Sequence, residues 1–269
     1  TQQIHATIIG CGKMGESLIQ GWLHGNLLKH ADIIDPAGLP DSLSNQHKLF
    51  HVNNIEEAEL IETDIVILCV KPQIMDIVCA GIKNYLHMNV PVLSIAAGTD
   101  TAYFDRQFAP NTPIIRVMPN LPATIGKGMS ALYANEAVSE AQKDLAHDLF
   151  SAAGEVVWLD DENQMDAVTA LSGSGPAYLF HLIEVMTNAG EKIGLSPQQA
   201  TLLARQTIIG ASALAEASPE IPAAILRENV TSKGGTTEAA LEILMDGRWQ
   251  EIMDKALKAA RDRGQELAR

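Results

Sequence analysis

Residues 4–15 read IHATIIGCGKMG, and they give the strongest indication of the fold. The run Ile4–Ile9 is mostly apolar and has the length of a strand, and Gly10, Gly12 and Gly15 follow it closely. The next residues place apolar side chains on one stripe of a helix that should end at Gly25 in a left-handed cap. A strand, a glycine turn and a helix in this order predict the first unit of a doubly wound α/β domain.

Each glycine of this loop has its own expected role. Gly10 permits a tight turn, Gly12 lets a pyrophosphate approach the backbone, and Gly15 allows the helix to pack closely on the strand. The first helical turn, which contains Lys13 and Met14, then presents free N–H groups to the phosphates. The loop therefore predicts binding of a nicotinamide or related dinucleotide.

Asp35 closes the second predicted strand and lies 20 residues after Gly15. An acidic side chain there would bind the 2′-hydroxyl of the adenosine ribose and repel a 2′-phosphate, which favours NAD over NADP. The alternative is that Asp35-Pro36 merely starts a turn. No arginine follows closely to bind a phosphate, so the sequence leaves the choice of cofactor open.

Two later segments are expected to line the cofactor because they lie at the carboxyl ends of predicted strands. The carboxyl ends of parallel strands are where such sheets bind ligands. Lys71 could contact cofactor or substrate, or could be a solvated loop lysine, whereas the second segment offers only a closely approachable backbone. The residues concerned are Cys69, Val70, Lys71 and Pro72 in the first segment, and Ala96, Ala97 and Gly98 in the second.

Strand and helix patterns divide the chain near residue 160. Short apolar runs between helices predict a Rossmann-like N-terminal domain, residues 1–160, with a mostly parallel sheet. Long helical segments at 176–193 and 197–217 predict an all-helical C-terminal dimerisation domain, residues 161–269, whose several apolar faces indicate an interlocked homodimer. The predicted strands are Ile4–Ile9, Asp32–Asp35, Ile65–Val70, Pro91–Ala96, Ile114–Met118 and Val156–Leu159.

Composition excludes several classes of function. A net charge of −14 with no basic run argues against nucleic-acid binding. The apolar runs are far shorter than the roughly 20 residues of a membrane helix, which favours a cytoplasmic protein without membrane partners. The three cysteines share no metal-ligand spacing, and no histidine pair flanks a glutamate at helical spacing, so no metal is expected.

Four segments outside the glycine loop are too specific for scaffolding alone. They are residues 70–72 (VKP), 116–120 (RVMPN), 172–178 (SGSGPAY) and 231–237 (TSKGGTT). In this order and spacing, across essentially the whole chain, they resemble pyrroline-5-carboxylate reductase. The resemblance implies reduction of 1-pyrroline-5-carboxylate to L-proline, the last step of proline biosynthesis, with NADP(H) or alternatively NAD(H), by a homodimer that could assemble further.

The resemblance also implies where the substrate binds. Ser232, Gly235, Thr236 and Thr237 supply hydroxyls and N–H groups ahead of a helix at 238–244, as an anion site requires. Thr237 is expected to orient the ring nitrogen, with the proton coming from the iminium itself or through water. The alternative is simple helix capping by Thr236 or Thr237.

Two asparagines are further candidates for contacts with the ligands. Asn54 could contact the adenosine half of the cofactor or cap a helix, and Asn120 could bind substrate or hold a turn. Leu121 departs from the family, in which a threonine commonly follows this asparagine.

A β-hydroxyacid dehydrogenase would need a lysine on the helix at 176–193, which offers none before Lys192. A non-catalytic redox sensor would have no use for the hydroxyl-rich segment at 231–237.

Overall fold

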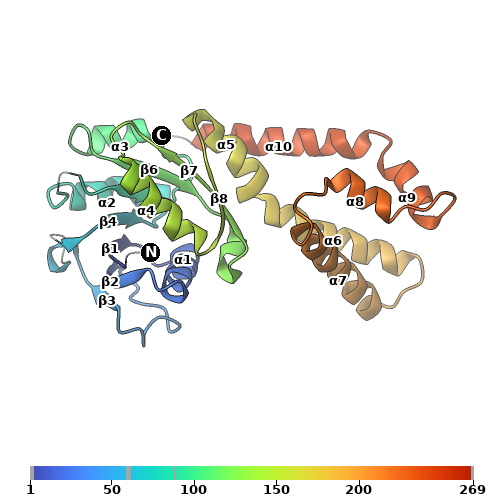
Figure 1. Ribbon diagram of the computed structural model, residues 1–269, viewed down its shortest axis with the longest axis horizontal. Helices are drawn as coiled ribbons and strands as arrows, with labels where there is room; N and C mark the ends of the chain where they lie inside the picture. Colours follow the sequence, from blue (N-terminus) through green and yellow to red (C-terminus); the bar gives the residue numbers. More distant parts are fainter. Residues whose placement is uncertain (1–2, 59–61, 88, 268–269) are drawn as a thin grey trace. The chain divides into compact units, whose positions relative to one another are not determined.

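The computed structural model describes residues 3–58, 62–87 and 89–267. The chain forms two compact units, one of residues 1–174 together with 260–269 and the other of residues 175–259 (Figure 1). The domain boundary near residue 160 stays a prediction. Among the described residues, no helix combines the length and the apolar character needed to cross a membrane.

The first unit contains an eight-stranded sheet in the order β3-β2-β1-β4-β5-β6-β7-β8. All neighbouring strands run parallel except β6 and β7, which are antiparallel. This confirms the mostly parallel α/β domain. The strands are β1 (Ile4–Ile9), β2 (Leu28–Ile34), β3 (Leu49–Val52), β4 (Ile65–Leu68), β5 (Val92–Ser94), β6 (Ile114–Met118), β7 (Gly128–Ala134) and β8 (Gly154–Trp158).

Helices cover both faces of this sheet. On one face α1 (Lys13–His24) and α4 (Glu140–Ser151) pack through Trp22 and Phe150, whose side chains are fully buried. Burial of each such side chain stabilises the fold by about 1.5–3 kcal/mol, and the Trp22 indole also donates to the Leu149 carbonyl at 2.8 Å. On the other face α2 (Met75–Ile82) and α3 (Thr101–Gln107) form a second core with β4 and β5.

The glycine loop lies where the winding of the sheet reverses. Strand β1 pairs with β2 on one side and with β4 on the other, so the chain moves outward in both directions from β1 (Figure 1). In open α/β sheets this reversal leaves a crevice beyond the carboxyl ends of the strands, and ligands bind there. Gly10 to Gly15 follow the carboxyl end of β1, which places them at this position.

Three local details differ from the sequence-based expectations. The strands β3 and β7 were not anticipated, and β2 begins at Leu28, not at Asp32. Helix α1 does end at Gly25, but the predicted left-handed cap there is wrong: Gly25 has φ −72°, and Asn26, at φ 53°, is the left-handed residue. Asparagine tolerates this conformation, so the left-handed position needs no glycine.

The second unit is entirely helical, which confirms the predicted character of the C-terminal region. Its buried apolar residues, among those described, are Ala200 and Ala204 of α7, while many large apolar side chains are exposed. Such helices lack a core of their own. The helices are α6 (Gly175–Lys192), α7 (Pro197–Glu216), α8 (Ala223–Asn229), α9 (Thr236–Leu244) and α10 (Arg248–Leu267), of which α10 continues past this unit.

The remaining helical turns are short and belong to the first unit. They connect strands or lead toward α6, and the last of them along the chain, Thr169–Gly173, is a π-helical turn. They are η1 (Ile55–Glu57), η3 (Pro72–Ile74), η4 (Leu121–Ile125), η5 (Glu162–Gln164), α5 (Met165–Val168) and η6 (Thr169–Gly173).

Candidate active site

Two of the three loop glycines are required by the protein's own packing. Gly10 has φ +91°, and a Cβ on it would lie 2.6 Å from the Cys69 carbonyl oxygen. A Cβ on Gly15 would lie 3.0 Å from the Gly10 carbonyl oxygen and 3.3 Å from the Cys69 Cβ. These two glycines therefore let the loop and α1 lie directly on the end of β4.

Gly12 is different, because a Cβ on it would meet no protein atom within 4 Å. Its backbone is extended (φ −67°, ψ −176°) and it is the N-cap of α1, with no side-chain capping hydrogen bond. The N–H groups of the first helical turn, which includes Lys13 and Met14, have no acceptor inside the helix and lie at the positive end of its dipole. The open space and these donors fit the pyrophosphate of a dinucleotide.

Asp35 connects the glycine loop to the end of β2. Its Oδ2 accepts the Cys11 N–H at 2.6 Å, and its Oδ1 accepts the Ala37 N–H at 2.8 Å. The Asp35 carbonyl oxygen lies 2.9 Å from Nε2 of His51 in β3. The turn-forming role considered for Asp35 is thus present, together with an unforeseen hold on the loop. The ribose contact stays a prediction.

The thiol of Cys11, in the glycine loop, and that of Cys69, beside the loop, are uncharged at neutral pH. Burial, with smaller contributions from the negative charges of Asp35 and Glu16, raises the pKa of Cys11 to about 11. Burial also raises the pKa of Cys69 well above its ordinary value. Because neither thiol ionises at neutral pH, neither adds a negative charge that would repel a phosphate group at the N-terminus of α1.

The other candidate cofactor segments lie at the same sheet edge as the loop. Strands β4 and β5 are parallel neighbours on the far side of β1 from β2, so their carboxyl ends share its edge. After β4, Val70 is half-buried and Lys71 is exposed ahead of Pro72 in η3. After β5, Ala96 is buried, Ala97 is exposed and Gly98 has φ +69°, where a side chain would strain the backbone.

Asn54 and Asn120 both have structural partners. Asn54 caps η1, accepting the Glu57 N–H at 3.2 Å, so the capping role is present and the adenosine contact stays a prediction. The Asn120 amide donates to the Ser172 carbonyl at 3.2 Å and accepts the Met129 N–H at 2.9 Å. Asn120 therefore holds the start of η4 against β7 and the π-helical turn.

The segment Thr231–Thr237 lies in the second unit. Its first five residues form a glycine turn, and Thr236 and Thr237 are the first two residues of α9, which begins two residues earlier than the predicted start at 238. Gly234 has φ +72°, and a Cβ on Gly235 would collide with the Ser232 hydroxyl. Gly235 is the N-cap of α9 and has no side-chain capping bond, so neither Thr236 nor Thr237 plays the capping role considered above.

One backbone donor of this turn is already engaged by an acidic side chain. The Glu238 carboxylate, in the first turn of α9, accepts the Gly234 N–H at 2.6 Å. The hydroxyls of Ser232, Thr236 and Thr237 stand beside this interaction along the chain and can supply further donors to an anion. A carboxylate is thus already accommodated at one donor of the turn.

The structure places the candidate residues in two groups. The cofactor candidates belong to the first unit and gather at one edge of its sheet, around the N-terminus of α1. Ser232, Gly235, Thr236 and Thr237 belong to the second unit, at the N-terminus of α9.

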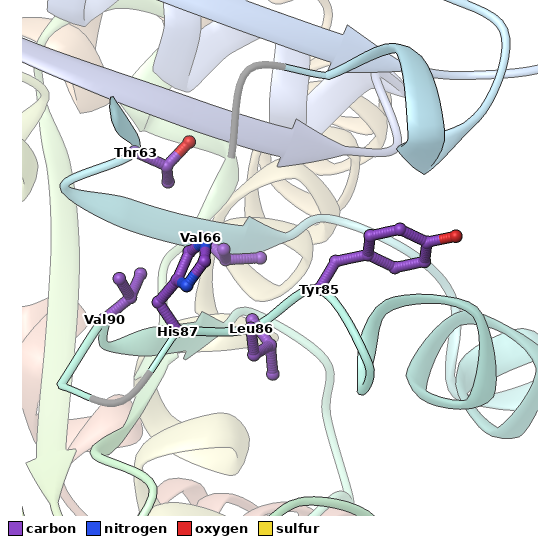
Figure 2. Close-up of a pocket in the computed structure, with 6 residues that line it drawn as sticks. All are labelled: Thr63, Val66, Tyr85, Leu86, His87 and Val90. Atoms are coloured by element: carbon purple, nitrogen blue, oxygen red, sulfur yellow. The ribbon is translucent and has the colours of Figure 1, made fainter. Parts of the chain in front are cut away.

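A small pocket in the first unit lies elsewhere. It is at the amino ends of β4 and β5, because its residues come from the start of β4 and from the segment that leads into β5 (Figure 2). The glycine loop follows the opposite, carboxyl, ends of the strands. The pocket is therefore separate from the candidate cofactor site. Its lining residues are Thr63, Val66, Tyr85, Leu86, His87 and Val90.

Sequence reasoning missed a buried ion pair that supports the edge near Gly98. Arg116 of β6 is buried and donates to Glu162 at 2.7 Å, and the same carboxylate accepts the N–H (2.8 Å) and the hydroxyl (2.6 Å) of Thr101 at the start of α3. The signal was an arginine on an apolar strand, since a buried charge requires a partner.

Comparison with known proteins agrees with this geometry. A family model described as pyrroline-5-carboxylate reductase dimerisation matches residues 162–267, and one described as NADP oxidoreductase, coenzyme F420-dependent, matches residues 5–98. The pyrroline-5-carboxylate reductase of Pseudomonas aeruginosa is 43% identical over 263 residues, covering 97% of this chain and 95% of its own.

Two solved structures extend the similarity to the fold. A pyrroline-5-carboxylate reductase from Coxiella burnetii has a TM-score of 0.92 at 34% identity, and one from Plasmodium falciparum, with NADP bound, has a TM-score of 0.84 at 29% identity. Both comparisons cover 100% of both chains. With a relative at 43% identity over nearly its full length, the chain belongs to the pyrroline-5-carboxylate reductase family.

Proposed function

We propose that this protein reduces 1-pyrroline-5-carboxylate to L-proline, the last step of proline biosynthesis, with NADPH as hydride donor and NADH as an alternative. The observation that carries the proposal is the open N-terminus of α1 at Gly12, in a chain that belongs to this reductase family. A bound nicotinamide would supply the hydride to the imine carbon. The imine nitrogen takes the electron pair of the C=N bond and carries a proton in the product.

The chain's own residues would bind and orient the two reactants. Gly12, Lys13 and Met14 would hold the pyrophosphate through the first-turn N–H groups of α1. Ser232, Gly235 and the threonines after them would hold the substrate carboxylate at the N-terminus of α9. Thr237 would orient the ring nitrogen, and most of the rate enhancement would come from this positioning.

A direct assay tests the proposed function. The protein is mixed with 1-pyrroline-5-carboxylate and either NADPH or NADH, and loss of the nicotinamide absorbance is followed. We expect substrate-dependent oxidation and formation of L-proline in equal amounts. If neither reduced cofactor is oxidised by folded protein, the reductase assignment is wrong.

The preference between the two cofactors depends on Asp35. The family model matching residues 5–98 and the NADP-bound relative favour NADP(H), although Asp35 adds a negative charge near the expected ribose position. For Asp35→Asn we expect the ratio of kcat/KM with NADPH to that with NADH to rise roughly fivefold, because a charge about 4 Å from a phosphate costs about 1 kcal/mol in water. Steady-state kinetics with both cofactors measure this ratio.

Asp41→Asn is the matched control for this substitution, since Asp41 is exposed farther along the same loop. It should leave the ratio unchanged. A fall in the ratio for Asp35→Asn, or an equal rise for Asp41→Asn, would show that Asp35 does not lie near the 2′-position.

The second unit is the proposed dimerisation surface, and the dimer could assemble further. The model described as pyrroline-5-carboxylate reductase dimerisation covers this region, and its helices expose apolar side chains such as Phe180, Leu203 and Ile209, each at least half exposed. Exposed large apolar side chains in this number are typical of helices that pack against another subunit. We also propose the cytoplasm as the compartment, because Cys11, Cys69 and Cys79 are free thiols, as is usual in reducing compartments.

Substitution of one apolar residue on α7 tests the dimer. Ile209→Glu would place a charge in the proposed interface at a cost of about 3 kcal/mol, which weakens association more than 100-fold. Light scattering across a concentration series should show a monomer. Gln198→Glu adds the same charge at a polar position of α7 and should leave a dimer. An unchanged mass for Ile209→Glu would exclude this face.

A further inference from the structure

The structure brings His5, His30 and Asp32 together on one face of the sheet. His5 of β1 is the register partner of His30 of β2, and Asp32 follows two residues later, so all three side chains project from the same face. Nε2 of His30 lies 2.9 Å from one carboxylate oxygen of Asp32, and Nε2 of His5 lies 3.5 Å from the other.

The His5 ring is the informative member of this cluster. Its side chain is 7% exposed, and its Nε2 is the one buried side-chain nitrogen or oxygen atom among the described residues that has no hydrogen-bond partner. A buried polar atom without a partner costs about 1–3 kcal/mol. This nitrogen lies 3.5 Å from the Asp32 carboxylate and makes no hydrogen bond to it, and this separation equals that of two ligand atoms on one tetrahedral metal ion.

We propose that His5, His30 and Asp32 form a binding site for a divalent transition-metal ion, with Zn²⁺ as the ion of best fit. Two imidazole nitrogens and one carboxylate oxygen are ligands that Zn²⁺ accepts, and bonds of about 2.0–2.2 Å at tetrahedral angles put neighbouring ligand atoms about 3.3–3.5 Å apart. The three ligand atoms all lie within 4.8 Å of one another, so small rotations of the side chains complete the site.

Neighbouring residues hold the ligands in place. The Phe50 ring of β3 stacks on His30 with ring centres 4.3 Å apart and planes 10° from parallel. The backbone N–H of His5 donates to the Asp64 carboxylate at 2.8 Å, which fixes the backbone at this position. The His30 side chain is 23% exposed, and it leaves a route for an ion and for a water as fourth ligand. Such support from surrounding groups is typical of metal sites.

The site is separate from the reductase chemistry and departs from the expectation of no metal. Four residues lie between His5 and Gly10, so the two are five steps apart along the chain, a span of about 17 Å at 3.3–3.4 Å per step. A bound ion would therefore join β1 to β2 and stabilise the sheet without touching the cofactor site. Sequence spacing could not show the cluster, because His5 comes from a different strand.

Metal binding to the full-length chain without a purification tag tests the proposal. After removal of metals with a chelator, Zn²⁺ is titrated against a chromophoric competitor, and Co²⁺ is added separately to record the visible spectrum. We expect one Zn²⁺ per chain, tetrahedral Co²⁺ bands, and a rise in Tm of roughly 5–10 °C at 100 times the dissociation constant. No retained Zn²⁺, or only octahedral Co²⁺ bands, would overturn the proposal.

Variants then assign the ion to this cluster. His30→Ala should weaken Zn²⁺ binding at least tenfold and abolish the Co²⁺ bands, and His30→Gln serves the same purpose if the alanine variant does not fold. His181→Ala is the matched control, because His181 pairs with Glu184 at 3.1 Å on an exposed helix surface. Unchanged binding in the His30 variants, or an equal loss in His181→Ala, would place the ion elsewhere.

Discussion

The Gly12→Val variant is expected to fold normally and to lose cofactor binding. A Cβ at this position meets no protein atom within 4 Å, and the extended backbone accepts a β-branched side chain, so the valine costs little stability. The same side chain would fill the space over the N-terminus of α1 that the pyrophosphate needs. Titration calorimetry should show NADPH affinity lower by at least about 100-fold, or about 2.7 kcal/mol, with a nearly unchanged Tm.

Gly10→Ala is the contrasting variant in the same loop. Its Cβ would lie 2.6 Å from the Cys69 carbonyl oxygen at a residue with φ +91°, so it should lower the Tm clearly. Gly12 thus separates ligand binding from folding, whereas Gly10 does not. Tight NADPH binding by Gly12→Val would show that the phosphates lie away from the end of α1.

Thr237→Ala is expected to lower turnover about 100-fold while leaving the NADPH dissociation constant within about twofold. The hydroxyl belongs to the proposed substrate site in the second unit, and loss of one oriented donor at a reacting centre costs about 2.7–4 kcal/mol. Helix capping does not explain the expected loss, because the N-cap of α9 is Gly235. Single-turnover kinetics measure the chemical step, and fluorescence titration measures cofactor binding.

Two further threonine variants test whether the hydroxyl itself matters. Thr237→Ser keeps the hydroxyl and should restore most of the activity. Thr231→Ala removes a hydroxyl that donates to the Arg227 carbonyl at 2.7 Å, so it should leave turnover nearly unchanged. If Thr237→Ala weakened only NADPH binding, Thr237 would belong to the cofactor site and not to the substrate site.

A strand could be predicted where its hydrophobic pattern in the sequence was clear. Strand β1 was predicted at Ile4–Ile9 because this run is mostly apolar and is followed by the glycine turn, and the structure shows it buried along its whole length. Strand β7 was missed because GMSALYA contains small residues and few of the β-branched or aromatic residues that favour strands. Strand β2 was anticipated too late because Lys29 and His30 interrupt its apolar pattern.

The sequence could indicate which residues belong to the candidate site, but not the contacts that they make. The three loop glycines look alike in sequence, and only the surrounding backbone separates Gly12, which faces open space, from Gly10 and Gly15. The role of Glu238 was invisible, since its hydrogen bond to Gly234 depends on the conformation of the glycine turn. Contacts of this kind depend on backbone dihedral angles that the types of the neighbouring residues do not specify.

The hydrogen bonds of Asp35 constrain any attempt to re-engineer cofactor choice. One carboxylate oxygen accepts the Cys11 N–H and the other accepts the Ala37 N–H, so the side chain that would discriminate the ribose also fixes the loop. Replacement by arginine, meant to attract a 2′-phosphate, would remove both acceptors and release the loop. A useful switch therefore needs a compensating second substitution that restores an acceptor for Cys11, and the two changes should be strongly non-additive.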